Sequence, residues 1–344
     1  GACHSRVYVG GGGVIAPAEI EQLHALGVAR IFSPEDGRRL GLEGMIRQIL
    51  VESAQRPGVD PHAELARLAP GEPVAGARLV SWFEAQGADA SAEAERLRAA
   101  LAGRRRAAPA PIVGFTGTGG AGKSSVVDEV VRRLRRDHPQ LTIGCLLVDP
   151  TRRRTGGALL GDRIRMNAIA QPGVYVRSLA TRQAHLALSQ AVRDAVAVLQ
   201  GAGFDLVLVE TAGIGQSDSE ITELADLSVY VMTPEYGAPS QLENIDMLDL
   251  ADLVVLNKSD RHGAEDALHD VRKQWRRNRT AFDAPDEAVP VFATIASRFG
   301  DAGTERFYRA LLARVAKRAG GDFAPPGAAV ATAADAKPLV PASR

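Results

Sequence analysis

The stretch VGFTGTGGAGKSS, from Val113 to Ser125, decides the fold of this chain. An apolar strand runs into a glycine-rich turn that fits the pattern G-x-x-x-x-G-K-[ST], and the amphipathic segment SVVDEVVRRLRR follows. Glycines let the backbone curl so that N–H groups point at phosphate oxygens, and a helix N-terminus favours an anion. The stretch therefore predicts a phosphate-binding loop between a strand and a helix.

The side chains of this loop have separate expected roles. Lys123 would neutralise the β- and γ-phosphates, and the Ser124 hydroxyl would coordinate Mg²⁺. The expected nucleotide-binding residues are Gly117, Thr118, Gly119, Gly120, Ala121, Gly122, Lys123, Ser124 and Ser125. So short a pattern can occur by chance in an unrelated turn, but a strand before it and a helix after it favour the phosphate loop.

A second motif, Asn257-Lys258-Ser259-Asp260, matches N-K-x-D at the end of the apolar run DLVVL. A carboxylate at Asp260 can accept hydrogen bonds from guanine N1–H and from the guanine amino group, whereas adenine has neither donor at that edge. An unpaired buried acceptor can give discrimination of roughly 10⁴ to 10⁵. Open α/β sheets bind ligands at the carboxyl ends of strands, so the motif predicts GTP or GDP rather than ATP.

A third motif, Glu210-Thr211-Ala212-Gly213, follows the apolar run FDLVLV. It stands where ordinary GTPases have D-x-x-G, with Glu in place of Asp. We predict that Lys123, Glu210 and Gly213 act in catalysis, with the Glu210 carboxylate on Mg²⁺ and the Gly213 N–H on the γ-phosphate. Asp149 and Asp162 are further candidate Mg²⁺ ligands, although both can equally be solvated loop acids.

The predicted fold class is α/β, a P-loop GTPase with a mostly parallel sheet. Six apolar runs alternate with helical segments from 111 to 318, which is typical of parallel α/β units. These runs are IVGFTG, TIGCLLVD, FDLVLVET, LSVYVMT, DLVVLNK and VPVFATI. Residues 319–344 are rich in Ala, Pro and Gly and are expected to be a flexible linker.

The N-terminal region carries another glycine run, RVYVGGGG, again after a strand. Strand, helix, strand and helix are expected over residues 1–55, a parallel unit too small to bury much surface alone. Gly10 and Gly11 are candidate ligand-binding positions, but the run can also be a tight turn without a ligand. Residues 56–110, with helical stretches broken by proline and glycine, are predicted to be a helical linker.

Composition narrows the possible partners. The 344-residue chain has zero formal net charge and 45% hydrophobic residues, so no global charge favours nucleic acid or a membrane. The basic run at 272–279 is interpreted as an exposed helix face. Two cysteines cannot form a disulfide framework, and we expect Cys145 to be a free, buried thiol. No apolar stretch reaches the roughly 20 residues of a membrane span. We therefore expect a cytoplasmic protein.

Longer stretches resemble one family in detail. VDPTRRRTGGALLGDRIRMNAI at 148–169, VETAGIGQSDSEI at 209–221 and YVMTPEYGAPSQLENIDMLDLAD at 230–252 are similar to the GTPase module of the fused isobutyryl-CoA mutases. These are relatives of the standalone GTPase chaperones of methylmalonyl-CoA mutase. The resemblance implies a GTPase that gates loading, unloading and repair of adenosylcobalamin on an acyl-CoA mutase domain, with a homodimer expected.

The same resemblance gives the first glycine run a different ligand from the second. The N-terminal segment is similar to the second half of the family's Rossmann-like cobalamin-binding domain, where glycines pack against the cofactor. However, the family's D-x-H-x-x-G motif is missing, and His62 is expected to be a surface helix residue. The upstream strands of that domain and the mutase substrate domains have no counterpart in this sequence either. We therefore expect this chain neither to hold cobalamin tightly nor to isomerise an acyl-CoA. The alternative is a nucleotide-switched interaction module with incidental turnover.

Overall fold

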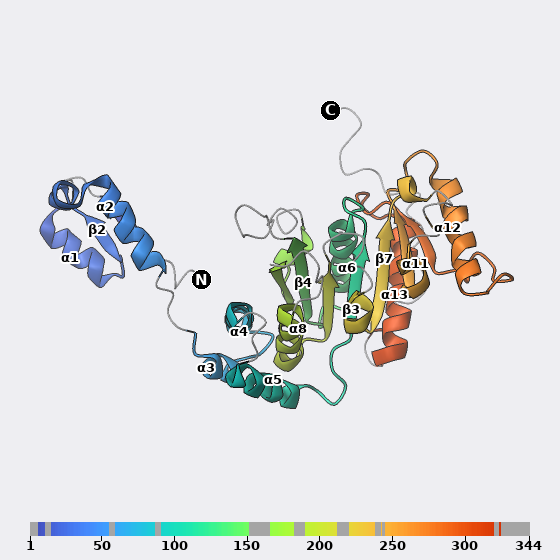
Figure 1. Cartoon of the computed structure of the whole chain (residues 1–344), viewed down its shortest axis with the longest axis horizontal. Coiled ribbons are helices and arrows are strands. Elements are labelled where there is room, and N and C mark those ends of the chain that lie inside the picture. The colour runs from blue at the N-terminus through green and yellow to red at the C-terminus, as the bar shows by residue number, and fades with distance from the viewer. Residues whose placement is uncertain are drawn as a thin grey trace. The chain divides into compact units, whose positions relative to one another are not determined.

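The chain forms two compact units, Gly1–Val59 and Asp60–Arg344. The computed structural model describes residues 6–10, 15–54, 59–86, 91–150, 166–181, 190–211, 220–237, 242, 245–319 and 323–324. Figure 1 shows the elements of both units, coloured along the chain.

The N-terminal unit has the predicted order of strand, helix, strand and helix. Strand β1 (Tyr8–Gly10) pairs in parallel with β2 (Arg30–Phe32), and α1 (Pro17–Ala25) connects them. Helix α2 (Pro34–Ala54) is interrupted at Gly41, whose φ of 64° is accessible to glycine at little cost. Two strands and two helices do not define a complete domain, so the Rossmann-like cobalamin domain stays a prediction.

This unit buries little. Among its described residues only Ile31 and Phe32 are buried. Leu42, Ile46 and Leu50 lie at helical spacing along α2 and are exposed. The small buried area agrees with the expectation that a parallel pair of strands cannot form a sizeable core.

The second unit contains a sheet of seven parallel strands in the order β5-β4-β6-β3-β7-β8-β9. Its strands are β3 (Ile112–Gly117), β4 (Ile143–Pro150), β5 (Val174–Thr181), β6 (Leu206–Glu210), β7 (Leu227–Met232), β8 (Leu253–Asn257) and β9 (Val291–Thr294). All six predicted strands are present, and the P-loop-type α/β sheet is confirmed. Strand β3 is the first of these strands in the sequence and the middle one in the sheet. The later strands therefore lie on both sides of it.

Helices cover both faces of this sheet, which explains why its central strands β3, β6, β7 and β8 are buried along their whole length (Figure 1). Alternate residues of β3 point to opposite faces: Val113 and Phe115 belong to one core and Ile112 to the other. Helices α6 (Lys123–Asp137) and α13 (Ala302–Ala319) supply the first core. The second is supplied by α4 (Pro73–Gln86), α5 (Ala92–Arg104), α8 (Gln190–Ala202), α9 (Ile221–Leu224), α11 (Met247–Leu250) and α12 (Ala264–Asn278).

The segment predicted as a helical linker packs on the sheet unit. It forms the short α3 (Pro61–Ala66) and then α4 and α5, whose Leu79 and Leu101 are fully buried in the same core as α8. Arg98 of α5 donates to both carboxylate oxygens of Asp194 at 2.8 and 2.9 Å. These helices therefore belong to the same compact unit as the sheet.

Strand β5 is the one strand of the sheet that the sequence analysis did not anticipate. Its sequence, VYVRSLAT, mixes polar and apolar residues, and the strand lies at the edge of the sheet, where it pairs only with β4.

The single described cysteine, Cys145 of β4, is buried and free as predicted, and burial raises the pKa of its thiol to about 12. None of the described helices has the length and apolar character needed to cross a membrane.

Candidate nucleotide site

The phosphate loop lies between β3 and α6, and two of its glycines cannot be replaced without movement. Gly117 has φ of 138°, and a Cβ there would lie 1.9 Å from the Val231 carbonyl oxygen. Gly122 has φ of 89°, and a Cβ there would lie 2.4 Å from Asn257 Nδ2. The loop therefore fits tightly between β7 and β8 because these positions have no side chain.

Lys123 begins helix α6 and folds back over the loop. Its Nζ donates to the carbonyl oxygens of Gly117 at 3.0 Å and Thr118 at 3.2 Å, and the residue is only 7% exposed. An ammonium group is thus held among backbone groups at a helix N-terminus, where an anion is also favoured. The local charge and dipole can both stabilise a phosphate.

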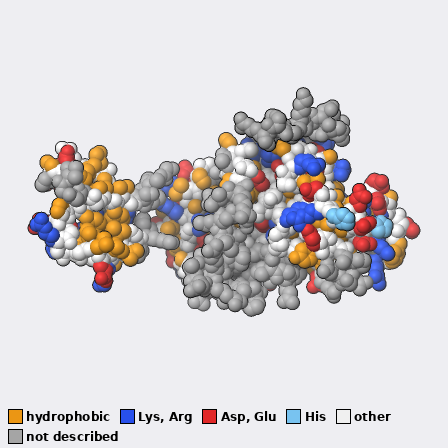
Figure 2. Space-filling model, turned by 90° about the horizontal axis from the view of Figure 1, so that it is seen from above, with side chains coloured by type: hydrophobic (Ala, Val, Ile, Leu, Met, Phe, Trp, Pro, Cys, Tyr) orange, Lys and Arg blue, Asp and Glu red, His pale blue; other side chains and the backbone are white. Residues whose placement is uncertain are grey.

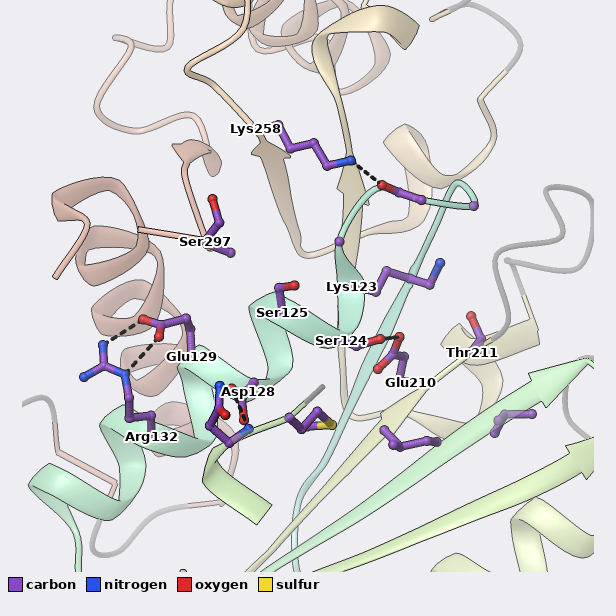
Figure 3. Close-up of a pocket in the computed structure, with 18 of the residues that line it drawn as sticks. Lys123, Ser124, Ser125, Asp128, Glu129, Arg132, Glu210, Thr211, Lys258 and Ser297 are labelled. Atoms are coloured by element: carbon purple, nitrogen blue, oxygen red, sulfur yellow. Dashed lines mark hydrogen bonds and ion pairs between the residues drawn. The ribbon is translucent and has the colours of Figure 1, made fainter. Parts of the chain in front are cut away.

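Ser124 and Glu210 meet beneath this loop. Ser124 Oγ donates to Glu210 Oε1 at 2.7 Å, and Figure 3 shows the pair beside Lys123. Glu210 ends β6, directly opposite Phe115 of β3 in register. A hydroxyl and a carboxylate are oxygen donors of the kind that Mg²⁺ prefers, with waters and phosphate oxygens filling the remaining positions. The pair fits a nucleotide-associated Mg²⁺.

Several other predicted positions lie outside the described residues. These are Gly11, Asp162, Gly213 and the side chain of Asp149. Within the part of the chain that the structure describes, no three His, Cys, Asp or Glu side chains are grouped as a metal site. Ser124 and Glu210 are thus the two predicted metal ligands that the structure brings together.

Asn257 connects the base-recognition motif to the phosphate loop. Its Nδ2 donates to the Ala121 carbonyl oxygen at 2.8 Å, while its Oδ1 accepts from Thr294 Oγ1 at 3.1 Å and from the Ala296 N–H at 3.0 Å. Lys258 Nζ donates to the Gly120 carbonyl oxygen at 2.7 Å (Figure 3). These contacts join residues that are 136 and 138 positions apart in sequence. The two motifs therefore share one edge of the sheet, as their separate strands predict.

Asp260 lies at the end of this motif with an exposed side chain, outside the set of cavity-lining residues. The neighbouring Arg261 forms an ion pair with Glu235, which follows β7. Hydrogen bonds from the Thr233 hydroxyl and from its own backbone N–H, together with one from Arg261, lower the pKa of Glu235 to about 2. The loop that carries Asp260 is thus tied to the end of the adjacent strand.

A cavity of about 880 Å³ lies over these elements. Its lining joins predicted residues, among them Lys123, Ser124, Glu210 and Lys258, to others that the sequence analysis missed. The missed lining residues are Asp128, Glu129, Arg132, Leu147, Val148, Met166, Asn167, Ala296, Ser297 and Phe299. Most come from α6 beyond its first turn or from the loop after β9, where no short motif marks a ligand contact.

Thr211 was quoted only as part of a motif, yet it contributes to the same wall. Its hydroxyl donates to Thr116 Oγ1 at 2.9 Å, and its N–H donates to the Phe115 carbonyl oxygen at 2.9 Å. Both threonines are buried. This contact fixes the first residue after Glu210 against the strand that carries the phosphate loop.

The N-terminal glycine run offers no comparable arrangement among its described residues. A Cβ added at Gly10 would meet no heavy atom within 4 Å. His62 is 61% exposed on α3, as predicted for a surface residue, and Asp60 caps that helix by accepting the N–H groups of His62 and Ala63. A cobalamin site in the N-terminal unit, Gly1–Val59, therefore stays a prediction.

Comparison with known proteins identifies the family. The family model described as methylmalonyl Co-A mutase-associated GTPase MeaB matches residues 76–311. The fused isobutyryl-CoA mutase of Geobacillus kaustophilus is 53% identical over 323 residues, covering 93% of this chain and 30% of the relative. That of Cupriavidus metallidurans is 51% identical over 327 residues, covering 92% and 29%.

The sheet unit also has a solved structural neighbour. The crystal structure of LAO/AO transport system kinase aligns with a TM-score of 0.54 and 22% identity, covering 76% of this chain and 78% of that one. This likeness supports the fold. The chain belongs to the family of methylmalonyl Co-A mutase-associated GTPases, and it spans about 30% of the length of the fused mutases that it matches.

Proposed function

We propose that this chain hydrolyses GTP in the cavity over the phosphate loop and uses the nucleotide state to control a cobalamin-dependent acyl-CoA mutase. One observation carries the GTPase part. Asn257 and Lys258 donate to the Ala121 and Gly120 carbonyl oxygens, so the base motif and the phosphate loop form one site. A nucleotide with its phosphates near Lys123 would have its base near the N-K-x-D loop.

The base would be guanine. Asp260 is exposed, and its carboxylate makes no hydrogen bond or ion pair with another described residue, so it can accept from guanine N1–H and N2–H. Adenine lacks donors at that edge. The discrimination then comes from leaving the carboxylate unpaired in the wrong complex.

Hydrolysis would rely on positioning and charge stabilisation. The backbone N–H groups of residues 117–125 and the Lys123 ammonium would hold the β- and γ-phosphates. Ser124 and Glu210 would hold Mg²⁺, which when bound neutralises developing charge on the phosphates. Thr211 is held against β3 by its contacts with Thr116 and Phe115, and the Gly213 N–H remains the predicted contact to the γ-phosphate. No described residue stands out as a general base, and we expect slow intrinsic turnover.

The mutase part of the proposal rests on the family and on the fused relatives. Both names connect such GTPases with acyl-CoA mutases. In this chain the GTPase would act as a chaperone for adenosylcobalamin loading, unloading and repair on an isobutyryl-CoA mutase-type domain. The partner would be a domain of the same parent chain or a separate subunit, and the module would work as a homodimer in the cytoplasm.

The test of the GTPase proposal is Mg²⁺-dependent phosphate release from GTP and from ATP. We expect turnover with GTP only, and no turnover in Lys123→Ala, because this change removes the ammonium that faces the phosphates. Lys317→Ala, at the last turn of α13, is the matched control and should behave as wild type. ATP turnover equal to GTP turnover would contradict the proposal.

The chaperone proposal needs its own measurement. Transfer of adenosylcobalamin to a mutase from this family would be followed by absorbance with GDP, with a non-hydrolysable GTP analogue and without nucleotide. We expect the transfer rate to depend on the nucleotide. A transfer rate that is the same under all three conditions, together with nucleotide-dependent binding to the mutase, would instead support an interaction module.

A further inference from the structure

Phe299 is an unusual residue in this cavity. It is a large aromatic side chain that is 64% exposed, and it lies in the loop between β9 and α13. It lines the same cavity as Gly120, Lys123 and Lys258. Exposed apolar residues are common on protein surfaces, so exposure alone says little. What sets Phe299 apart is the set of contacts that hold its ring.

Arg132 of helix α6 lies over the Phe299 ring, with its guanidinium carbon 4.5 Å from the ring centroid. Arg132 is itself fixed by Glu129, because its Nε and Nη2 donate to the two carboxylate oxygens at 2.9 and 2.7 Å (Figure 3). The guanidinium plane is thus locked by a bidentate pair while it stacks on the ring. Both Arg132 and Glu129 line the cavity.

A further arginine, Arg133, also pairs with Glu129. Arg133 is 1% exposed, and it bonds Glu129 and donates its Nε to Glu305 Oε2 of α13 at 3.0 Å. Burial alone would raise the pKa of Glu129, but hydrogen bonds from Arg132 and Arg133 outweigh it and lower that pKa. Glu129 is therefore a carboxylate that stays charged and keeps Arg132 in place.

Hydrogen bonds hold both ends of the loop that carries Phe299. The Asp301 carboxylate accepts from the Ile295 N–H at 3.1 Å and the Thr304 N–H at 2.7 Å. The Ala296 N–H donates to Asn257 of the base motif. The loop that carries Phe299 therefore contacts the base motif at Ala296, and Phe299 lines the same cavity as Lys258 of that motif.

We propose that Phe299 contacts the nucleoside part of the bound guanine nucleotide and that Arg132 is the residue that positions its ring. This inference rests on the proposed function, because it assigns the nucleoside to this side of the cavity. An aromatic side chain that is fixed before binding loses little entropy when a planar ligand stacks on it. Figure 2 shows other apolar side chains on the surface. Among the described large apolar residues that are exposed, Phe299 is the one that both lines this cavity and contacts an arginine.

The test is calorimetric binding of GDP with Mg²⁺ and, separately, of inorganic pyrophosphate with Mg²⁺ to the whole chain. Phe299→Ala should weaken GDP binding about ten-fold, the size expected for loss of an aromatic stacking contact. Phe299→Leu should show most of that loss. Pyrophosphate binding should match wild type in both variants, because pyrophosphate lacks the nucleoside that Phe299 is proposed to contact.

Arg132 variants test the positioning role. Arg132→Gln should weaken GDP about three-fold, the size of a partly exposed cation–π contact, and Arg132→Lys should recover part of that loss. Arg136→Gln is the matched control on the same helix, since Arg136 pairs with Asp137 and Glu305 and does not line the cavity. It should bind GDP as wild type does.

The outcomes separate this inference from the proposed function. Wild-type binding of GDP with no change in Phe299→Ala would overturn the role of Phe299 and leave the GTPase proposal intact. Equal losses for GDP and pyrophosphate would mean that Phe299 acts on the fold of the loop, which would also overturn it. Absence of GDP binding to the wild-type chain would contradict both proposals.

Discussion

The chain contains two glycine-rich stretches, each of which begins at the end of a parallel strand, and the surroundings of the two strands differ. Strand β3 pairs on both sides and is buried along its whole length, whereas β1 pairs with β2 alone and is partly exposed. The turn after β3 lies under Asn257 and against Val231. A glycine turn becomes a candidate nucleotide site when neighbouring strands bring polar groups across it, and its own sequence is only part of the cause.

The largest expected contrast is between one alanine substitution in each turn. Gly117→Ala puts a Cβ 1.9 Å from the Val231 carbonyl oxygen in a backbone conformation that alanine disfavours, so we expect GDP binding to fall below detection. Gly10→Ala meets no atom within 4 Å and should bind GDP as wild type does. Calorimetry measures both, with thermal melting as the check on folding.

If Gly117→Ala fails to fold, Lys123→Ala gives the same contrast without a steric clash. Loss of GDP binding in Gly10→Ala, with binding retained in Lys123→Ala, would reverse the assignment of the two turns.

The second contrast concerns the base. Asp260→Asn should shift nucleotide preference from GTP toward XTP, by up to roughly 10⁴, because the amide can donate to the xanthine 2-oxo group and no longer accepts from both guanine donors. Competition between the two nucleotides for hydrolysis measures the shift. Asp266→Asn, on the exposed first turn of α12, is the control. An unchanged GTP preference would remove Asp260 from the site.

The sequence predicted the central strands of the sheet unit, but it did not predict the edge strand β5 or the packing of α4 and α5 on the sheet. Six strands were predicted because each is an apolar run, and four of them, β3, β6, β7 and β8, are buried along their whole length. The phosphate loop was predicted because its glycines form a recognisable pattern. Strand β5 was missed because an edge strand need not be apolar, as Arg177 and Ser178 illustrate. The packing of α4 and α5 was missed because alanine-rich helices give a weak apolar pattern.

The site could be predicted only where a motif defines it. Lys123, Ser124, Asn257 and Lys258 were predicted from motifs, and the structure brings these residues together at one edge of the sheet, while their binding roles stay predictions. Arg132 and Phe299 come together from α6 and from the loop after β9, and no spacing in the sequence connects them. Contacts of this kind depend on how two elements pack, which a single sequence does not encode in any local pattern.

The third contrast tests the boundary between the two units. Leu79→Ala empties a buried site between α4 and its neighbours and should lower the free energy of unfolding by about 2 to 5 kcal/mol. Leu42→Ala, at a side chain on α2 whose residue is 71% exposed, should change it by less than about 0.5 kcal/mol. Urea unfolding followed by circular dichroism measures both. Equal effects would contradict the inclusion of α4 in the sheet core.

The smallest expected effect is a pH dependence of the Glu129 cluster. The pKa of Glu129 is lowered below its usual value of 4.5 in the folded protein, so its contribution to stability is present above that pH and is lost as the pH falls through the folded pKa. Wild type should thus be more stable than Glu129→Gln at pH 7, with the difference shrinking below about pH 4.5. A difference independent of pH would show that the charge is not the cause.

The most direct test of the account is amide hydrogen exchange of the whole chain with and without GDP and Mg²⁺. Nucleotide should slow exchange in residues 117–125 and 257–260 and leave exchange in residues 7–10 unchanged, because only the phosphate loop is proposed to hold the nucleotide. Protection of residues 7–10 without protection of residues 117–125 would contradict it.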